Sequence, residues 1–114
     1  MEHYQEPLDG IFHALAHPAR RAVLGRLGRG PVSISALAAP FDMALPSFMK
    51  HIRLLEESGL ISTRKAGRVR TAALEPARFA AVEGWLETQR AIWTGRTDRL
   101  EAFVTNPDHQ ESPE

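Results

Sequence analysis

The stretch D-M-A-L-P-S-F-M-K-H-I-R-L-L-E-E-S-G-L-I, from Asp42 to Ile61, decides the fold. Phe48, Ile52 and Leu55 recur at spacings of four and three residues, the period of a helical face that packs against other helices. A second, polar stripe of the same helix consists of Ser47, Lys50, His51 and Leu54. Since that stripe mixes a hydroxyl, a cation and an imidazole, it is better suited to contacting DNA than to packing in a core.

Both ends of this helix are marked in the sequence. Pro46 suits a first turn, where its missing N–H costs nothing. The residues before it, Ala44 and Leu45, offer no side-chain oxygen as a cap. At the other end, Ser58 and Gly59 stop the helix, because Gly59 tolerates the left-handed conformation that such a stop requires.

Residues 61–74 change to an extended pattern, with two arms around Ala66 and Gly67. A glycine at the tip supplies the positive φ that a tight turn often needs, so we expect a β-hairpin. Its cations are Arg64, Lys65, Arg68 and Arg70. A helix with a polar face followed by a basic hairpin is typical of a winged helix-turn-helix.

The rest of the chain fits this architecture. Expected before the polar helix are a helix from Leu8 that Pro18 closes, a second from about Ala19 to Leu27, a brief strand at 32–34 and a short helix at 36–39. Glu75 and Pro76 open a long final helix, which Asn106 and Pro107 end. The predicted fold is mainly α with a small hairpin wing, in the order α-α-α-α-β-β-α. The predicted domains are a flexible lead at 1–7, the winged helix-turn-helix at 8–105 and a disordered tail at 106–114.

Composition narrows the class of protein. The 114 residues carry no net charge and contain no cysteine, which excludes disulfides and thiolate metal sites. Between Phe12 and Leu74, however, ten Lys or Arg residues oppose three acids, a local net charge of +7, while the flanks carry −7. A basic centre is compatible with binding DNA. With no apolar span, no signal peptide and no nucleophile or phosphate-loop motif, we expect a cytoplasmic protein that is not an enzyme.

The chain resembles the ArsR family of transcriptional repressors. The resemblance rests on three stretches, L-A-H-P-A-R-R-A-V-L at 15–24, P-S-F-M-K-H-I-R-L-L-E-E-S-G-L-I at 46–61 and R-K-A-G-R-V-R-T-A-A-L at 64–74. It implies a homodimer whose first and last helices pair and whose recognition helices enter successive major grooves of a palindromic operator. It also implies repression by exclusion of polymerase, and an autoregulatory role.

On that resemblance, the predicted DNA-binding residues lie on the polar helix and the wing. They are Leu45, Ser47, Lys50, His51, Arg53, Arg64, Arg68 and Arg70. Two departures from the family pattern are notable, since relatives usually carry Ser where this chain has Ala44 and Met49. Leu45 replaces a usually polar residue and is expected to contact a thymine methyl group. Arg20 and Arg21 stay ambiguous, because one of them could instead pair with a carboxylate.

The predicted dimer interface combines apolar residues of the first and last helices. They are Leu8, Ile11, Phe12, Leu15, Trp85, Ile92, Trp93, Leu100 and Phe103. The apolar stripe of the final helix is longer than a domain of this size can cover, so a second copy is the preferred cover over the protomer's own core.

We expect no cofactor and no metal site of the usual family type, which places the chain in the metal-independent branch. A small-molecule inducer of unknown identity stays open. One alternative is a metal-responsive sensor with an unusual His/carboxylate site, for which His13 and His17, four residues apart, and the terminal His3 and His109 are the candidates. The other is a winged-helix module that binds protein rather than DNA.

Overall fold

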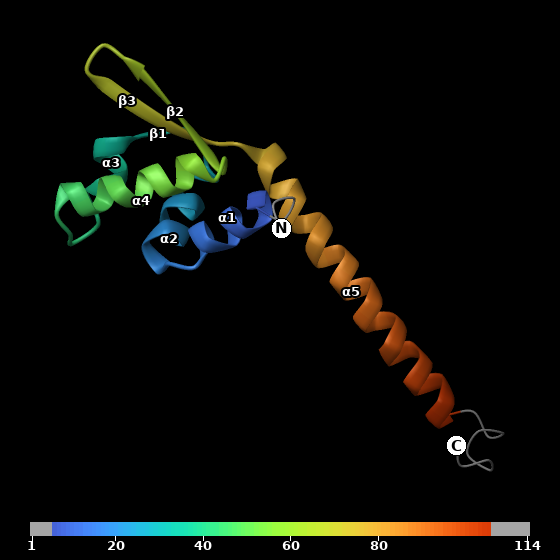
Figure 1. Ribbon diagram of the computed structural model, residues 1–114. Coiled ribbons are helices and arrows are strands. Elements are labelled where there is room, and N and C mark those ends of the chain that lie inside the picture. The colour runs from blue at the N-terminus through green and yellow to red at the C-terminus, as the bar shows by residue number, and fades with distance from the viewer. Residues whose placement is uncertain (1–5, 106–114) are drawn as a thin grey trace. The chain divides into compact units, whose positions relative to one another are not determined.

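A computed structural model describes the backbone of residues 6–105 and the side chains of residues 7–95. Its elements are α1 (Glu6–Leu15), α2 (Pro18–Leu27), β1 (Val32–Ser33), α3 (Ile34–Ala38), α4 (Leu45–Glu57), β2 (Ile61–Ala66), β3 (Val69–Leu74) and α5 (Pro76–Thr105) (Figure 1). The chain divides into two compact units, Met1–Val82 and Glu83–Glu114. The predicted order of elements and the winged helix-turn-helix fold are confirmed. The predicted lead and tail lie almost entirely outside the described residues.

The helix boundaries follow local chemistry. Pro18 begins α2 rather than closing α1, and the Nδ1 atom of His17 caps the new helix by accepting from the backbone N–H of Ala19 at 3.0 Å. Ser33 caps α3 in the same way, through a 3.2 Å bond from the N–H of Ala36. The histidine cap had no counterpart in the sequence prediction, since Ser, Thr, Asp and Asn are the usual caps.

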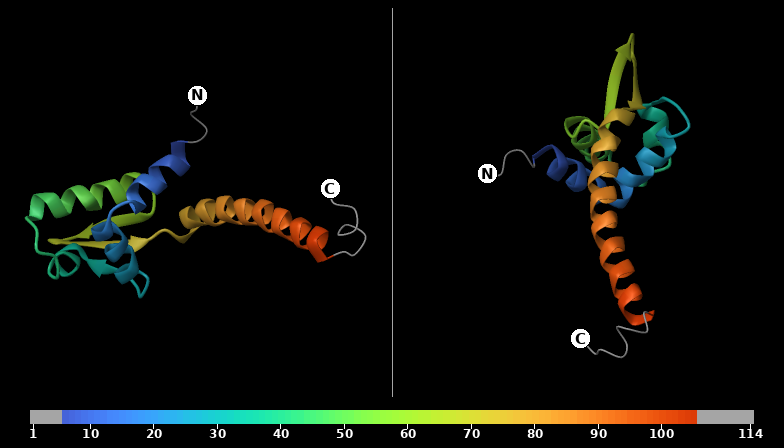
Figure 2. Two further views of the ribbon diagram at one scale, coloured as in Figure 1. Left: turned by 90° about the horizontal axis from the view of Figure 1, so that it is seen from below. Right: turned by 90° about the vertical axis from the view of Figure 1, so that its right-hand side faces the viewer.

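The three strands form an antiparallel sheet in the order β1-β3-β2. β2 and β3 pair from Ile61 opposite Leu74 to Ala66 opposite Val69, and Gly67 takes a φ of 64° in the turn between them. β1 adds a short third strand on the other edge of β3. The hairpin extends beyond the helices of the first unit in Figure 1 and in the right view of Figure 2.

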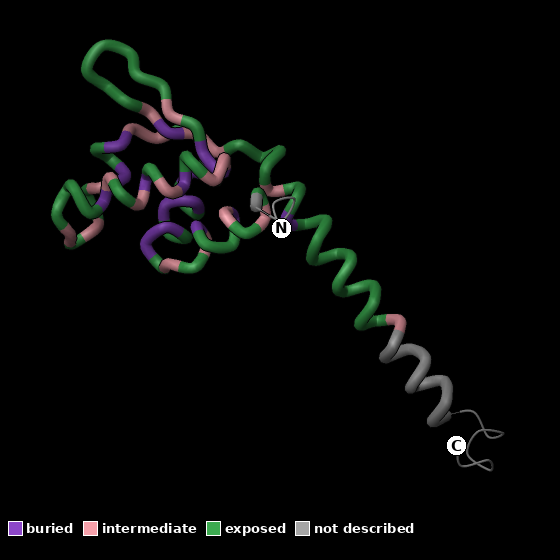
Figure 3. The backbone as a smooth tube through the Cα atoms, viewed as in Figure 1, coloured by how far each residue is buried: buried purple, intermediate pink, exposed green. Residues whose placement is uncertain are grey.

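The first unit closes a hydrophobic core of its own. Helices α1, α2 and α4 contact one another, and α2, α3 and β1 contact β3. The largest completely buried side chains are Phe48, Ile11, Leu37, Ile52, Leu55, Leu60, Ile61 and Val23. Figure 3 shows the buried backbone concentrated in these elements. Because Phe48, Ile52 and Leu55 are among them, the inward face of α4 is the one that the sequence predicted.

Helix α5 has two different parts. Phe79 and Val82, in its first turns, pack in or against the core of the first unit. From Glu83 to Thr94 every residue is exposed, as the green tube of Figure 3 shows. Within the described part of the chain, no helix combines the length and the apolar character that crossing a bilayer requires.

Candidate nucleic-acid interface

The polar side of α4 is the first component of the candidate interface. Ser47, Lys50 and Arg53 are exposed, and neither cation forms an ion pair with another residue whose side chain is described. The helix begins after Ala44, whose backbone is extended (φ −64°, ψ 146°) and whose side chain makes no cap bond, as the sequence predicted. Leu45, in the first turn, is 59% exposed. The predicted contact residues of α4 other than His51 are therefore available to a ligand.

His51 differs from these residues because its ring contacts two side chains of its own protomer. Its Nδ1 atom lies 2.9 Å from the Nη1 atom of Arg20, and its ring centroid lies 4.3 Å from that of His17. Burial, with smaller contributions from the nearby His17 and Arg20, lowers the pKa of His51 below its ordinary value of 6.5. The ring is only half-buried, so part of its surface still faces solvent.

Arg20 is buried, with 6% of its surface exposed. Its Nε atom donates to the carbonyl of Ala14 at 2.7 Å and its Nη2 atom to the carbonyl of His13 at 3.0 Å. These are carbonyls at the C-terminal end of α1, where the helix dipole favours a cation. The sequence left open a carboxylate partner for Arg20, but in the structure Arg20 donates to two backbone carbonyls and an imidazole. Arg21 likewise donates to a carbonyl, that of Leu15, at 2.7 Å.

The wing is the second cationic component, and α4 fixes its base. Arg64, Lys65, Arg68 and Arg70 are all exposed. The Nη1 atom of Arg70 donates to the Thr63 hydroxyl, which in turn donates to the Oε2 atom of Glu56, both at 2.8 Å. Arg70 thus links the wing to the end of α4, a role that the sequence did not indicate, and keeps other N–H groups for an outside acceptor.

Three comparisons with known proteins agree with this geometry. Residues 15–64 match a family model described as a helix-turn-helix domain. The HTH-type transcriptional regulator Rv2034 of Mycobacterium tuberculosis is 33% identical over 94 residues, which span 82% of this chain and 84% of that protein. The crystal structure of the ArsR family transcriptional regulator RHA00566 is 64% identical, with a TM-score of 0.77, over 82% of this chain and 97% of that one. The chain belongs to the ArsR family of transcriptional regulators.

A third relative bears on the direction of regulation. The transcriptional repressor SdpR of Bacillus subtilis is 28% identical to this ArsR-family chain over 61 residues, 54% of this chain and 68% of that protein. Since the relatives are regulators with a DNA-binding fold, the prediction of a DNA-binding protein rather than an enzyme is confirmed.

The predicted interface residues of this ArsR-family chain fall into four groups. Exposed apolar side chains are Phe12 (37%), Trp85 (42%), Ile92 (56%) and Trp93 (66%), whereas Leu8 and Leu15 are half-buried. Ile11, at 0% exposure, belongs to the core of its own protomer and offers no surface to a partner. Leu100 and Phe103 lie among the residues whose side chains are not described.

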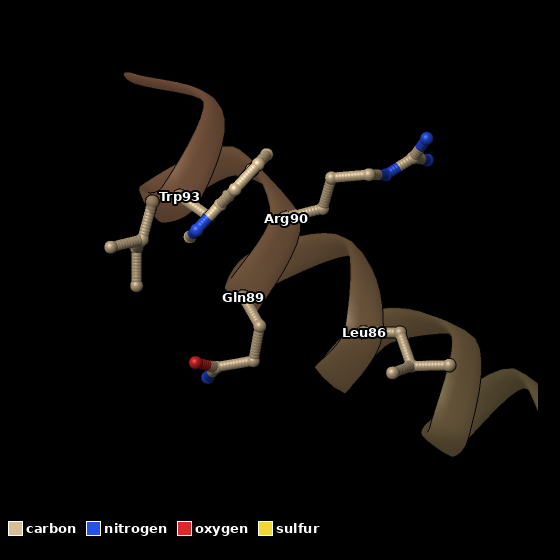
Figure 4. A pocket seen from close by; sticks show the side chains of 5 residues that line it. Leu86, Gln89, Arg90 and Trp93 are labelled. Atoms are coloured by element: carbon tan, nitrogen blue, oxygen red, sulfur yellow. The ribbon is translucent and has the colours of Figure 1, made fainter. Parts of the chain in front are cut away.

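The exposed face of α5 is continuous. Leu86, Gln89, Arg90, Ile92 and Trp93 line a hollow of about 500 Å³. Figure 4 shows that the labelled side chains project outward from a single helix, with Arg90 extended away from it, so the hollow is a surface groove. Arg90 pairs with Glu87 at 2.6 Å, which raises the pKa of Arg90 through that hydrogen bond.

For a metal site, the described residues hold no group of three or more His, Cys, Asp or Glu side chains that could bind an ion. His13 lies exposed on α1 and His17 caps α2, so the pair is divided between two helices. His3 and His109, the remaining candidates, lie outside the described residues.

Proposed function

We propose that this ArsR-family chain is a homodimeric repressor that binds a palindromic operator near its own promoter and needs no metal ion. The carrying observation is the pairing of two exposed surfaces on one chain, the cationic side of α4 with the wing, and the apolar face of α5. The first suits phosphate and base edges, and the second suits another copy of itself. The SdpR repressor supports repression as the outcome of binding.

A two-fold dimer explains how a short helix reads DNA with specificity. It places two copies of α4 about 34–36 Å apart, one turn of the duplex, so that each enters the major groove of one half-site. Lys50, Arg53 and the wing cations Arg64, Arg68 and Arg70 are assigned to phosphates. Ser47 and Leu45 are assigned to base edges, with Leu45 placed to meet a thymine methyl group, and His51 is assigned to a phosphate or a guanine acceptor.

The dimer is assigned to the helices at the two ends of the described chain. Trp85, Ile92 and Trp93 are spaced by seven and eight residues on α5, so they share one side of that helix. Phe12 adds an exposed aromatic side chain from α1, with Leu8 and Leu15 beside it. In the sequence, Leu100 follows Trp93 by seven residues and Phe103 follows Leu100 by three, so both positions continue the same helical spacing.

A mobility-shift assay tests the proposal on a duplex from the region directly upstream of the protein's own gene. Binding is expected to weaken steeply with added salt, because several phosphate contacts release counterions. Chelators are expected to leave binding unchanged, and added metal salts and small molecules are screened for release. Salt-independent binding to a protein partner, with no binding to any duplex, would instead support a protein-interaction module.

A further inference from the structure

Among the described side chains, Arg20 is the one buried charged residue, and its surroundings are unusual for a buried cation. Among the residues whose side chains are described, 7–95, no carboxylate pairs with it. Its acceptors are instead the carbonyls of Ala14 and His13 and the Nδ1 atom of His51. A buried guanidinium is stable only when its donors are satisfied, so each of these three bonds is part of the fold.

The bond to His51 fixes the protonation state of that ring. A guanidinium has donors only and does not lose its proton. At 2.9 Å, therefore, Nδ1 of His51 must be the acceptor and must carry no hydrogen. A neutral imidazole with a bare Nδ1 carries its proton on Nε2.

The ring of His17 supports the same state. Nδ1 of His17 accepts from the N–H of Ala19 at 3.0 Å, so it too carries no hydrogen when it caps α2. The two rings lie 4.3 Å apart beside the Arg20 cation. Adding a proton to His51 would place a second cation against Arg20, which agrees with the lowered pKa of His51.

The remaining nitrogen of His51 is the one left for an outside partner. Across residues 7–95, Nε2 of His51 makes no hydrogen bond, and His51 lies one position after Lys50 on the candidate recognition helix. The ring is half-buried rather than enclosed. His51 thus offers DNA a single N–H donor at a fixed place.

We propose that Arg20 is a positioning residue that holds His51 as an Nε2–H donor, so that this residue of α4 recognises hydrogen-bond acceptors on DNA. The acceptors of this chemistry are phosphate oxygens, the N7 and O6 atoms of guanine, the N7 atom of adenine and the O4 atom of thymine. A base amino group, such as N4 of cytosine, is rejected because two donors would meet. The proposal rests on the proposed DNA binding and adds which groups His51 reads.

The protonation state is tested on the free protein by long-range ¹H–¹⁵N correlation of its histidine rings at pH 7.5. We expect His51 to show a protonated Nε2 and an unprotonated Nδ1. The Arg20→Gln variant is expected to lose this preference and show a mixture of tautomers. An Nδ1–H tautomer or an imidazolium in the wild-type protein would overturn the proposal, even if Arg20→Gln fails to fold.

Recognition is tested separately by fluorescence anisotropy with the upstream duplex, in which single purines are replaced by 7-deazapurines and single phosphates by methylphosphonates. One substitution is expected to weaken wild-type binding roughly three- to tenfold, the effect of one hydrogen bond. The same substitution should have no effect on His51→Ala, whereas Lys50→Ala should keep the wild-type penalty. If no position loses its penalty in His51→Ala, His51 reads no acceptor.

The two tests distinguish a failure of the Arg20–His51 proposal from a failure of the proposed repressor function. A protein that binds the duplex while His51 carries its proton on Nδ1 overturns the positioning role of Arg20 and leaves the repressor assignment intact. A protein that shows the expected tautomer but binds no duplex contradicts both DNA binding and the recognition role of His51. The positioning of the His51 ring by Arg20 would still hold.

Discussion

The two units of this chain treat their apolar residues in opposite ways. In the first, Phe48, Ile11 and Leu37 are at most 1% exposed, in a core to which helices α1 to α4 and the sheet contribute. In the second, Trp93, Ile92 and Leu86 are each more than half exposed along one helix. Large aromatic side chains are costly to leave in water, and a single helix has no second layer to cover them.

The buried apolar residues of the first unit stabilise the fold, whereas the exposed apolar residues of the second unit are those assigned to the proposed homodimer. The first unit encloses its own hydrophobic core, and it exposes Ser47, Lys50 and Arg53 on α4 and the four cations of the wing. In the proposed homodimer, a second copy covers the apolar face of the second unit. Mutations in the first unit should therefore lower stability or DNA binding, whereas mutations in the second should weaken self-association.

The largest effect is expected in the core of the first unit. Phe48→Ala removes a side chain that is 1% exposed and leaves a cavity, so it should lower the free energy of unfolding by about 3–5 kcal/mol. Urea unfolding followed by circular dichroism measures this. Leu45→Ala, on the same helix but 59% exposed, is the control and should change stability by less than about 0.5 kcal/mol. Similar losses at the two positions would contradict the assignment of the inward face.

The next effect belongs to the second unit and to assembly. Trp93→Ala should leave the first unit folded but raise the dimer dissociation constant by on the order of 30-fold, equivalent to the ~2 kcal/mol of an aromatic hot spot. Sedimentation velocity over a concentration series measures it. Glu87→Gln, whose exposed ion pair with Arg90 is worth little, should shift the constant by less than about threefold. An unchanged constant in Trp93→Ala would remove the apolar face from the interface.

The third prediction concerns the backbone conformation of Gly59, in the first unit. Gly59 ends α4 with a φ of 84°, and a methyl group there would also lie 2.6 Å from the Nε atom of Arg78, so that side chain would have to shift. Gly59→Ala should therefore cost about 1–2 kcal/mol of unfolding free energy. Gly25→Ala, in the middle of α2 with open space around it, should instead stabilise by about 0.5–1 kcal/mol. Thermal unfolding compares the two, and a neutral Gly59→Ala would show that the helix stop is relaxed.

A smaller and salt-dependent effect is expected at the DNA surface. Lys50→Ala should weaken binding to all duplexes alike and reduce the slope of log affinity against log salt by about 1, without changing thermal stability. Ser47→Ala is the matched variant on the same helix, and it should change sequence preference while the salt slope stays constant. If the Lys50→Ala protein kept the wild-type salt slope, Lys50 would not contact a phosphate.

The smallest effect is a pH dependence of stability. Because the pKa of folded His51 lies below 6.5, the unfolded chain takes up a proton first as the pH falls. The stabilising contribution is therefore complete above about pH 6.5 and is lost as the pH drops through the folded pKa. The groups that face the ring are His17, from the turn between α1 and α2, and Arg20, from α2. No described carboxylate bonds to the ring.

Urea unfolding at pH 7.5 and 5.5 measures this loss. His51→Gln should flatten it, whereas His13→Gln, at an exposed position on α1, should keep the wild-type dependence. An increase in wild-type stability towards pH 5.5 would contradict the direction of the shift.

Periodicity predicted most of this fold from the sequence. The helix α4, its end and the hairpin turn are all encoded by nearby residues. The helix follows from the spacing of Phe48, Ile52 and Leu55, its end from Gly59 and the turn from Gly67, and the structure has all three where they were expected. The third strand was anticipated at residues 32–34, but its pairing partner was not, because Val32 meets Ala72 only through a long-range contact.

The roles of Arg20 and Arg70 could not be predicted in the same way. Arg20 follows no apolar period and looks like a surface cation, yet it lies where the end of α1 and the side of α4 converge, 31 residues away from His51 along the chain. Arg70 reaches Glu56 through Thr63 only after the hairpin has folded back. Such bonds depend on tertiary packing, and no local sequence pattern encodes them.

The most direct test of the central claim is sedimentation equilibrium of the wild-type protein, alone and with the upstream duplex. The proposed homodimer should give a species of twice the 12.7 kDa chain mass at micromolar concentration, and two chains bound to each operator duplex. A protein that stays monomeric, or that binds DNA as one chain per duplex, would contradict the claim that the apolar face of α5 pairs two copies of α4 for one site.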